Sequence, residues 1–274
     1  MEGAGTSVTD KRGREQSPLE KIAPKFGHIT HVIAVMSGKG GVGKSTVSAL
    51  LALSLARAGW RVGILDADIT GPSIPRMFGL DGGIEPAPGG GILPATAEMG
   101  IKVISLNLLL PHEDDPVIWR GPLISGTVKQ FWEEVAWGEL DCLVVDLPPG
   151  TGDVPLTVMQ VIPLSGMVIV SSPQDLALMV VRKAINMARA LNIPLLGLIE
   201  NMSYVSCPKC GEEIHLFGPS RAQEVAVKAG IPLTAVLPLD PALAALCDTG
   251  QVAAYEDREM GRFAAQLLQL PALG

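Results

Sequence analysis

The stretch Gly38-Lys39-Gly40-Gly41-Val42-Gly43-Lys44-Ser45-Thr46 decides the fold of this 274-residue chain. It follows an apolar segment, residues 31–36, and precedes an amphipathic segment that ends near Arg57, which indicates a strand, a glycine-rich turn and then a helix. Glycines permit the backbone conformations in which successive N–H groups face one anion-binding concavity. The positive end of the following helix points to the same place. The stretch is therefore predicted to be a phosphate-binding loop.

The loop contains two lysines, and they have different expected roles. Lys44 is placed to reach the β and γ phosphates of a nucleotide, and the Ser45 hydroxyl suits a Mg²⁺ ion. Lys39 directly follows the first glycine, and an ordinary loop does not need it. From the residues alone, Lys39 is either a solvated surface charge or a second phosphate contact.

The string GKGGVGKST resembles the deviant loop of the family that includes the septum-site MinD proteins, the ParA partition ATPases and the nitrogenase iron protein. This resemblance implies that Lys39 reaches across a homodimer interface to the partner's nucleotide. A cation in that position would stabilise charge on the transferred phosphoryl group, as an arginine finger does. The resemblance therefore implies an ATPase in which Lys39 and Lys44 are both catalytic.

Composition excludes several classes of protein. A hydrophobic content of 47 % is too high for disorder over most of the chain. The net charge of −7 argues against nucleic acid as the main partner, because phosphate backbones attract basic surfaces. No apolar run approaches the ~18 residues of a membrane span. The N-terminus has no apolar core of a secretion signal and carries acidic residues that a mitochondrial presequence avoids, so we expect a cytoplasmic protein without membrane contact.

The remaining chain alternates between strand and helix patterns. Residues 1–27 have no periodicity and are predicted to be a flexible N-terminal arm, and residues 28–274 to form one ATPase domain. Alternation of strands and helices predicts an α/β fold, a single P-loop NTPase domain with a doubly wound, mostly parallel sheet flanked by helices. Residues 69–100 are rich in Gly and Pro and are predicted to be irregular. The predicted strands are 31–36, 61–65, 101–106, 142–146, 166–170, 195–199 and 233–237, and the predicted helices are 47–58, 121–137, 176–191 and 255–270.

Acidic residues follow two of the predicted strands, and ligands bind at the carboxyl ends of strands in such a sheet. Asp146 ends a continuous apolar strand and is expected to hold Mg²⁺ together with Ser45. Asp68 is expected to orient or deprotonate the attacking water, unless it only faces solvent. Asp66 is expected to shape the metal site. Asp153 is a third acidic group after these strands, in the stretch LPPGTGD.

Two further residues are candidates for contact with the nucleotide base. Asn201 closes the strand 195–199 and matches the asparagine that contacts adenine in the MinD and ParA family, although asparagine is also an ordinary turn residue. Asp240, in Pro238-Leu239-Asp240-Pro241, is the second candidate. With Gly38–Thr46, these residues make up the predicted nucleotide site.

The sequence Cys207-Pro208-Lys209-Cys210-Gly211 lies in a predicted loop, 203–218, and carries a second function. Two thiols with two residues between them can bind one metal ion, but they supply only two of the four usual ligands. A redox pair is one alternative, and zinc completed by His215 or by a partner chain is another. A dimer supplies four thiolates, which suits a bridging [4Fe–4S] cluster or a Cys₄ zinc site. Cys142 and Cys247 lie in apolar settings and are expected to be structural.

Four separate motifs resemble the Mrp-type iron–sulfur cluster carrier ATPases over about residues 29–250. They are WRGP at 119–122, LPPGTGD at 147–153, NMS at 201–203 and CPKCG at 207–211. The resemblance implies an ATP-dependent homodimer that assembles a labile [4Fe–4S] cluster at Cys207 and Cys210 and transfers it to apo-proteins.

The main alternative is a positioning ATPase of the MinD or ParA kind with a structural zinc knuckle. Membrane-bound examples end in a basic amphipathic helix. The amphipathic segment 255–270 has only two basic residues, so packing against the sheet is the simpler expectation. A nitrogenase-reductase-like electron donor is a third alternative, but its cluster cysteines are far apart in sequence. Membrane association and DNA binding, the two roles of positioning ATPases, do not by themselves account for CPKCG.

Overall fold

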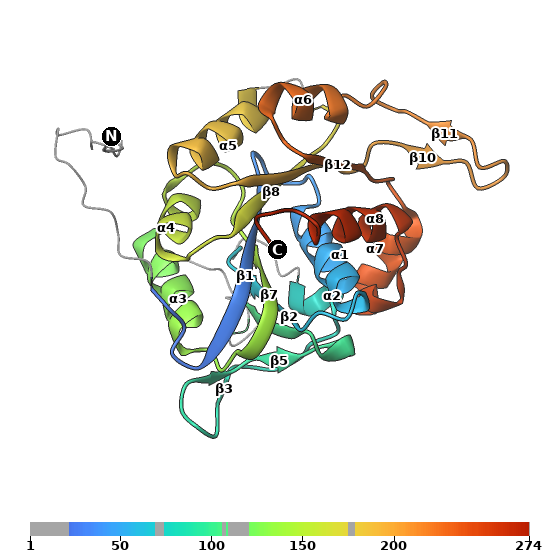
Figure 1. The fold of residues 1–274 in the computed structure, drawn as a ribbon. Coiled ribbons are helices and arrows are strands. Elements are labelled where there is room, and N and C mark those ends of the chain that lie inside the picture. The colour runs from blue at the N-terminus through green and yellow to red at the C-terminus, as the bar shows by residue number, and fades with distance from the viewer. Residues whose placement is uncertain (1–21, 69–73, 106–107, 109–120, 175–178, 274) are drawn as a thin grey trace, which may run out of the picture.

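The fold is an α/β arrangement, seen in a computed structural model that describes residues 22–68, 74–105, 108, 121–174 and 179–273 (Figure 1). Within these residues the strands are β1 Gly27–Ser37, β2 Val62–Asp66, β3 Glu85–Pro86, β4 Ile92–Leu93, β5 Ala95–Thr96, β6 Lys102–Ser105, β7 Gly138–Asp146, β8 Gly166–Ser171, β9 Leu195–Glu200, β10 Val205–Ser206, β11 Glu213–Ile214 and β12 Leu233–Val236. The α-helices are α1 Lys44–Arg57, α2 Ile74–Met77, α3 Gly121–Glu134, α4 Asp153–Val161, α5 Met179–Ala190, α6 Ala222–Ala229, α7 Pro241–Asp248 and α8 Arg258–Leu267. Short 3₁₀ turns occur at Glu98–Gly100 and Val252–Ala254.

The main sheet of the described residues has the order β12-β9-β8-β1-β7-β2-β6-β5. All neighbouring pairs are parallel except β5 with β6, which is antiparallel at one edge. Strands β2, β5 and β6 lie on one side of β1, β7 then fills the place between β1 and β2, and the chain crosses to β8, β9 and β12 on the other side of β1. The loop after β1 therefore lies at the point where the strand order reverses, which is where such sheets bind ligands.

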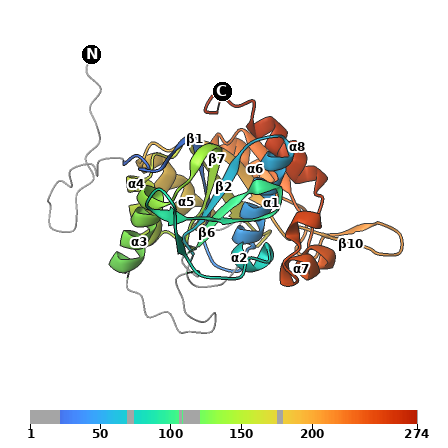
Figure 2. The ribbon, with the colours of Figure 1, turned by 90° about the horizontal axis from the view of Figure 1, so that it is seen from below.

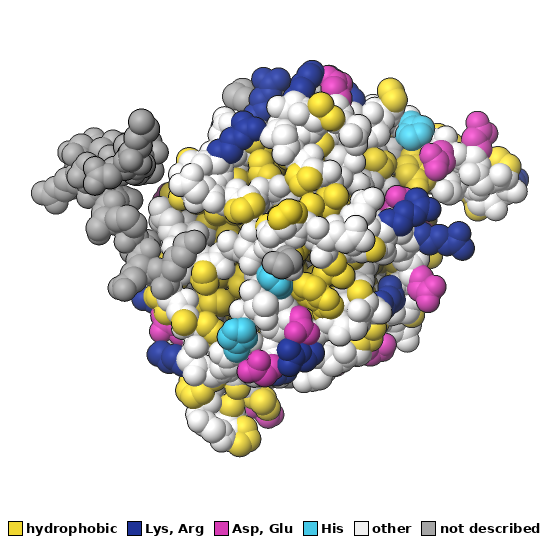
Figure 3. Space-filling model, in the orientation of Figure 1, with side chains coloured by type: hydrophobic (Ala, Val, Ile, Leu, Met, Phe, Trp, Pro, Cys, Tyr) yellow, Lys and Arg dark blue, Asp and Glu magenta, His cyan; other side chains and the backbone are white. Residues whose placement is uncertain are grey.

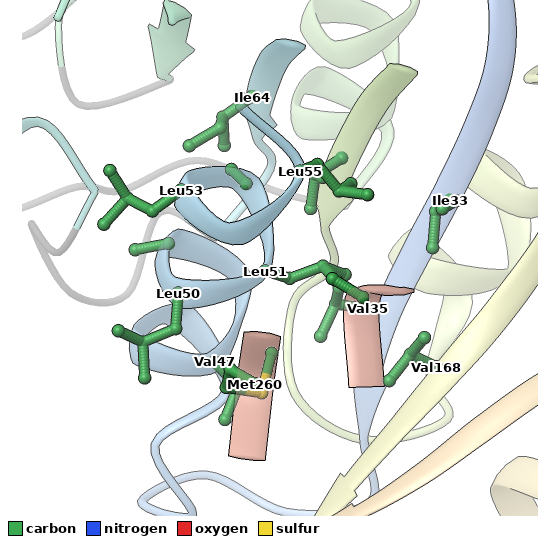
Figure 4. Close-up of a cluster of buried hydrophobic side chains, with 14 of the residues drawn as sticks. Ile33, Val35, Val47, Leu50, Leu51, Leu53, Leu55, Ile64, Val168 and Met260 are labelled. Atoms are coloured by element: carbon green, nitrogen blue, oxygen red, sulfur yellow. The ribbon is translucent and has the colours of Figure 1, made fainter. Parts of the chain in front are cut away.

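Helices cover both faces of the sheet (Figure 2). Helices α1, α2 and α8 share one buried cluster, and α3, α4, α5 and α6 share the other. Figure 4 shows Leu51 and Leu55 of α1 directed toward Ile33 and Val35 of β1. Helix α1 is buried on most of its circumference because α8 and α2 cover the sides that the sheet leaves open. The phosphate-binding loop is thus joined to two of the most buried elements of the domain.

The predicted fold class is confirmed, since the strands and long helices lie where the sequence placed them within a few residues. Three side chains of α3, those of Val128, Phe131 and Trp132, are 1 % exposed, and Val135 directly after the helix is 0 % exposed. Three short helices, α4, α6 and α7, were not predicted. Residues 69–100 are not wholly irregular, because α2, β3, β4 and β5 occur there and β5 adds an edge strand. The predicted positions Leu106 and Leu176 lie outside the described residues.

The C-terminal helix α8 buries its apolar face in the domain core. Met260, Phe263 and Leu267 are 0–1 % exposed, and Phe263 occupies the space beside Gly197 of β9 where a Cβ atom would come within 2.4 Å of its ring. Packing against the sheet, rather than against a membrane, was the expectation for this segment, and the burial agrees with it. In the described part of the chain, none of the helices has the length and apolar character needed to cross a bilayer.

Residues 22–27 contact the domain, although the sequence placed them in the arm. The indole N–H of Trp132 donates to the Ile22 carbonyl at 2.7 Å, and the Lys25 N–H donates to the Glu133 carbonyl at 2.8 Å. Strand β1 itself begins at Gly27, so described residues before position 28 belong to the domain.

Candidate nucleotide site and cysteine hairpin

The loop between β1 and α1 has the backbone conformation that its glycines predict. Gly41 and Gly43 have φ values of 79° and 75°, a left-handed region that favours glycine. A Cβ atom on Gly43 would lie 2.2 Å from Nδ2 of Asn201, so no larger residue fits there. Two hydrogen bonds also fix the start of the loop. The Ser37 hydroxyl donates to the Lys39 carbonyl at 2.9 Å, and the Gly150 N–H donates to the Ser37 carbonyl at 2.9 Å.

Lys44 lies between two of the predicted acidic residues. Its Nζ is 2.9 Å from Oδ2 of Asp146 and 3.3 Å from Oδ2 of Asp68, and the lysine side chain is 5 % exposed. The Ser45 hydroxyl donates to Oδ2 of Asp146 at 2.6 Å. The structure therefore brings Lys44, Ser45, Asp68 and Asp146 together beside the loop.

Two further serines complete this network, and the sequence analysis did not identify them. The Ser48 hydroxyl donates to Oδ1 of Asp146 at 2.6 Å, so both oxygens of this carboxyl accept a serine hydrogen bond. The Ser105 hydroxyl donates to Oδ2 of Asp66 at 2.8 Å. A signal for each exists in the sequence, because Ser48 follows Ser45 by three residues on one helix face and Ser105 lies opposite Asp66 on the neighbouring strand.

Burial and charge shift the pKa values of two groups in the site. Burial lowers the pKa of the Lys44 ammonium, but attraction by Asp146 and Asp68 and the hydrogen bond to Asp146 outweigh it, so the pKa is raised. Burial, followed by repulsion from Asp146, raises the pKa of Asp66 to about 8. Burial and the charge of Asp146 thus both favour the uncharged form of Asp66, while Asp146 and Asp68 favour the charged form of Lys44.

Asp66 and Asp146 are aligned by the sheet itself, because they are register partners on the parallel strands β2 and β7. Oδ1 of Asp66 accepts the Asp68 N–H at 3.0 Å, which fixes the turn that follows β2. Asp153 lies apart from this group, exposed in the first turn of α4, where its charge complements the helix dipole. Residues 69–73, which follow Asp68, lie outside the described residues.

Lys39 is exposed on the loop, whereas Lys44 is buried. Asn201 is 6 % exposed, and its Nδ2 donates to the Val42 carbonyl at 3.0 Å. The asparagine therefore contacts the loop backbone directly. Asp240 is the N-cap of α7, since its Oδ1 accepts the Ala242 N–H at 2.8 Å and its Oδ2 accepts the Tyr255 hydroxyl at 2.8 Å.

The cysteine motif lies in a projecting two-stranded hairpin, not in an irregular loop as the sequence suggested. Strands β10 and β11 pair antiparallel, and the Cys207 N–H donates to the Glu212 carbonyl at 2.8 Å (Figure 1). The Gly211 N–H donates a hydrogen bond to the Cys207 carbonyl at 2.9 Å, which closes the turn that carries both thiols. Figure 3 shows acidic and hydrophobic side chains mixed on this projection, and three of the hydrophobic ones are about half exposed: Ile214, Leu216 and Phe217.

The four cysteines have different environments, and none forms a disulfide. The N–H groups of Lys209 and Cys210, followed by the Cys210 thiol, lower the pKa of Cys207, because they stabilise its thiolate. Burial raises the pKa of Cys142, which is 0 % exposed in β7. Burial also raises the pKa of the half-buried Cys247. Cys142 thus has the buried, structural environment that was expected, while the surroundings of Cys207 favour its thiolate form.

One described chain does not complete a metal site at these thiols. Among the residues that the structure describes, no group of three or more His, Cys, Asp or Glu side chains is placed to hold a metal ion. His215, the proposed third zinc ligand, instead lies 3.7 Å from Oε2 of Glu213 and against the ring of Tyr204. The motif of a single chain therefore offers two ligands.

The fold and the loop define a P-loop NTPase of the deviant two-lysine type. The family described as "ParA: NUBPL iron-transfer P-loop NTPase" matches residues 28–270. The chain belongs to this family. The match spans almost the whole domain, including the loop and the cysteine hairpin.

Similar proteins and structures agree with this family. The chain is 44 % identical over 257 residues to an iron-sulfur cluster carrier protein of Clostridium perfringens, covering 91 % of this chain and 90 % of the relative. It is 47 % identical over 221 residues to a protein of the same description from Methanocaldococcus jannaschii, covering 80 % and 76 %. A nucleotide-binding protein of Archaeoglobus fulgidus, solved with ADP, has a TM-score of 0.77 and 50 % identity, covering 85 % of this chain and 90 % of that one. The MinD protein of Pyrococcus horikoshii with Mg-ADP has a TM-score of 0.57 at 20 % identity and covers 87 % and 96 %, which shows a shared fold.

Proposed function

We propose that this protein is an ATP-hydrolysing iron–sulfur cluster carrier that acts as a homodimer and transfers its cluster to apo-proteins. The observation that carries the proposal is the hairpin with two thiols, attached to a P-loop NTPase domain, to which the described part of the chain adds no third metal ligand. The relatives described as iron–sulfur cluster carriers support the same cargo. We also propose the cytoplasm as its compartment, on the sequence argument alone.

In this proposal the loop N–H groups of Gly38–Thr46 bind the phosphates, and Lys44 balances the charge on the β and γ phosphates. Phosphate oxygens then replace Asp68 and Asp146 as partners of the Lys44 ammonium. Asp68 is thereby available to orient or deprotonate the attacking water. Lys39 of each chain acts on the nucleotide of the other, where it stabilises charge in the transition state.

The donor atoms around Ser45 fit a Mg²⁺ ion. Ser45, Asp66 and Asp146 supply only oxygen, which is the ligand that Mg²⁺ prefers, and Mg²⁺ usually takes one or two carboxyls with the substrate phosphates. When bound, the ion neutralises charge on the β and γ phosphates. Asn201 and Asp240 are proposed to lie next to the base, with Asn201 also supporting the loop through Val42.

Two chains together supply four thiolates, from Cys207 and Cys210 of each. The exposed apolar side chains beside the thiols, Ile214, Leu216 and Phe217, give the hairpin a surface that a second copy would cover. We propose that the cargo is a [4Fe–4S] cluster held between the two hairpins. Zinc at the same cysteines, within a MinD-like or ParA-like positioning ATPase, is the alternative.

The direct test of this function is transfer to an apo-protein. Anaerobically reconstituted protein is mixed with an apo-ferredoxin, and the recovery of ferredoxin absorbance is followed with Mg-ATP, with Mg-ADP and without nucleotide. We expect transfer in all three, faster with Mg-ATP, because hydrolysis changes the contacts of the loop that supports the dimer. A failure to transfer iron and sulfide under any condition contradicts the carrier function.

The loop conformation predicts that Gly43→Ala weakens nucleotide binding without unfolding the domain. A left-handed φ and a contact of 2.2 Å with Asn201 force the loop out of its conformation, and a cost of about 1–2 kcal/mol for the φ alone weakens binding at least about fivefold. Titration calorimetry with Mg-ADP measures the change. The matched control is Gly126→Ala in α3, where an added Cβ meets no atom within 4 Å and binding is expected to stay as it is. Equal ADP affinity in the two variants contradicts the assignment of the loop.

A further inference from the structure

The segment Glu200–Ser203, here called the junction, lies between the phosphate-binding loop and the cysteine hairpin. It ends β9 and leads directly into β10 (Figure 1). The side chains of Glu200, Asn201 and Ser203 are 0 %, 6 % and 1 % exposed. Polar groups buried to this degree are held by hydrogen bonds, and the bonds of the junction lead to both sites.

Toward the nucleotide site, the junction contacts the loop in two ways. Asn201 donates from Nδ2 to the Val42 carbonyl at 3.0 Å. The same amide nitrogen fills the space that a Cβ on Gly43 would occupy, and the end of the Met202 side chain lies near that position at 3.3 Å. Met202 has a φ of 58°, which is uncommon for a residue with a side chain and persists only when the surroundings hold it. The loop and the junction therefore fix each other's conformation.

Toward the hairpin, the Glu200 carboxyl accepts a hydrogen bond at each end of the segment that carries the hairpin. The Ser203 hydroxyl donates to Oε1 of Glu200, and the Arg221 N–H donates to Oε2 at 3.4 Å. Residues 203 and 221 flank the segment 204–220, which carries the hairpin. The Ser203 N–H also donates to the Leu237 carbonyl at 2.9 Å. A single buried carboxyl thus positions the start and the end of the segment.

We propose that the junction couples nucleotide binding to the position of the cysteine hairpin, with Glu200 and Ser203 as positioning residues. The inference rests on the proposed function for the identity of the two ligands. Phosphates bound by the loop stabilise the backbone around Val42 and Gly43, and the contacts of Asn201 pass this restraint to the hairpin ends. A ligand shifts a conformation only by its difference in affinity for two states, so the hairpin must fluctuate more when the loop is free.

Amide hydrogen exchange of the full chain, reduced and anaerobic, tests the coupling with Mg-ADP as the probe. In the wild type, ADP is expected to slow exchange of the loop amides. It is also expected to slow exchange of three amides, here called the hairpin amides, by about threefold or more: those of Cys207, Gly211 and Leu239. In Ser203→Ala the loop keeps its protection, and the protection of the hairpin amides falls to less than half of the wild-type effect. Glu200→Ala gives the same loss, because it removes both acceptors, Oε1 for the Ser203 hydroxyl and Oε2 for the Arg221 N–H.

Ser165→Ala is the matched control, since Ser165 accepts a backbone hydrogen bond from Val32 directly before β8, at the end of this strand that lies away from the loop. It is expected to leave both effects of ADP unchanged. Protection of the loop without protection of the hairpin in the wild type overturns the coupling, as does full hairpin protection in both junction variants. Failure of ADP to protect the loop removes the proposed nucleotide site itself, and the coupling with it.

Discussion

The double variant Cys207→Ala/Cys210→Ala is expected to lose the iron–sulfur chromophore completely after anaerobic reconstitution with iron and sulfide. The substitutions remove both thiols of each chain. Among the described residues, no group of three or more ligand side chains exists that could replace them. The domain is expected to stay folded, because Cys207 is only partly buried and Cys210 is exposed, outside both cores. Iron and acid-labile sulfide assays and the visible spectrum measure the loss.

Cys247→Ala is the matched control for this variant. Cys247 is half-buried against the cluster around α1, with a pKa raised by burial, so its thiol is a poor metal ligand. This variant is expected to bind iron and sulfide as the wild type does. Reconstitution of the double variant to the wild-type level would place the cluster elsewhere and end the carrier proposal.

Lys39→Ala is expected to lower the rate of ATP hydrolysis by about a thousandfold, the low end of the effect of an arginine finger, while ATP affinity changes little. The reason is the proposed position of Lys39 at the partner's nucleotide, where its charge acts mainly in the transition state. Single-turnover hydrolysis and equilibrium binding of ATP separate the two quantities. Lys44→Ala provides the contrast, because it removes the buried charge that balances Asp146 and Asp68, and both binding and hydrolysis are expected to fall.

The matched control for Lys39→Ala is Lys129→Ala, an exposed lysine of α3 whose only described ion pair is with Glu133, 3.7 Å away. It is expected to leave hydrolysis and binding unchanged. A parallel loss of binding and hydrolysis in Lys39→Ala would mean that Lys39 acts on the nucleotide of its own chain in the ground state. The cross-dimer role would then be wrong.

The core of the fold was predictable because its signals are local. The loop at Gly38–Thr46 and the apolar strands give the order of elements, and parallel strands that end together bring Asp66 and Asp146 side by side. The short helices were harder to predict. Helix α4 contains Pro155 and follows a stretch rich in proline and glycine. Such a composition predicts a turn. Helix α7 did have a signal, since Asp240 followed by Pro241 is a typical N-cap and N1 pair.

The contacts of the sites were not predictable from periodicity. Asn201 and Val42 are 159 residues apart, and only the packing of β9 beside the central strands brings them together. The second strand of the hairpin, β11, has two residues, too few to show an alternating pattern. The burial of Glu200 likewise follows from its position at the end of β9, a strand with a neighbour on both sides, since its own sequence neighbours do not require it.

The central claim is that the cysteine site and the nucleotide site are each completed by a second chain. Native mass spectrometry of the anaerobically reconstituted protein tests it most directly. The expected species is a dimer that carries one cluster of four iron and four sulfide ions for two chains, and it is absent from the Cys207→Ala/Cys210→Ala variant. A monomer that carries its own metal ion, or a dimer that binds zinc and no sulfide, would contradict the account.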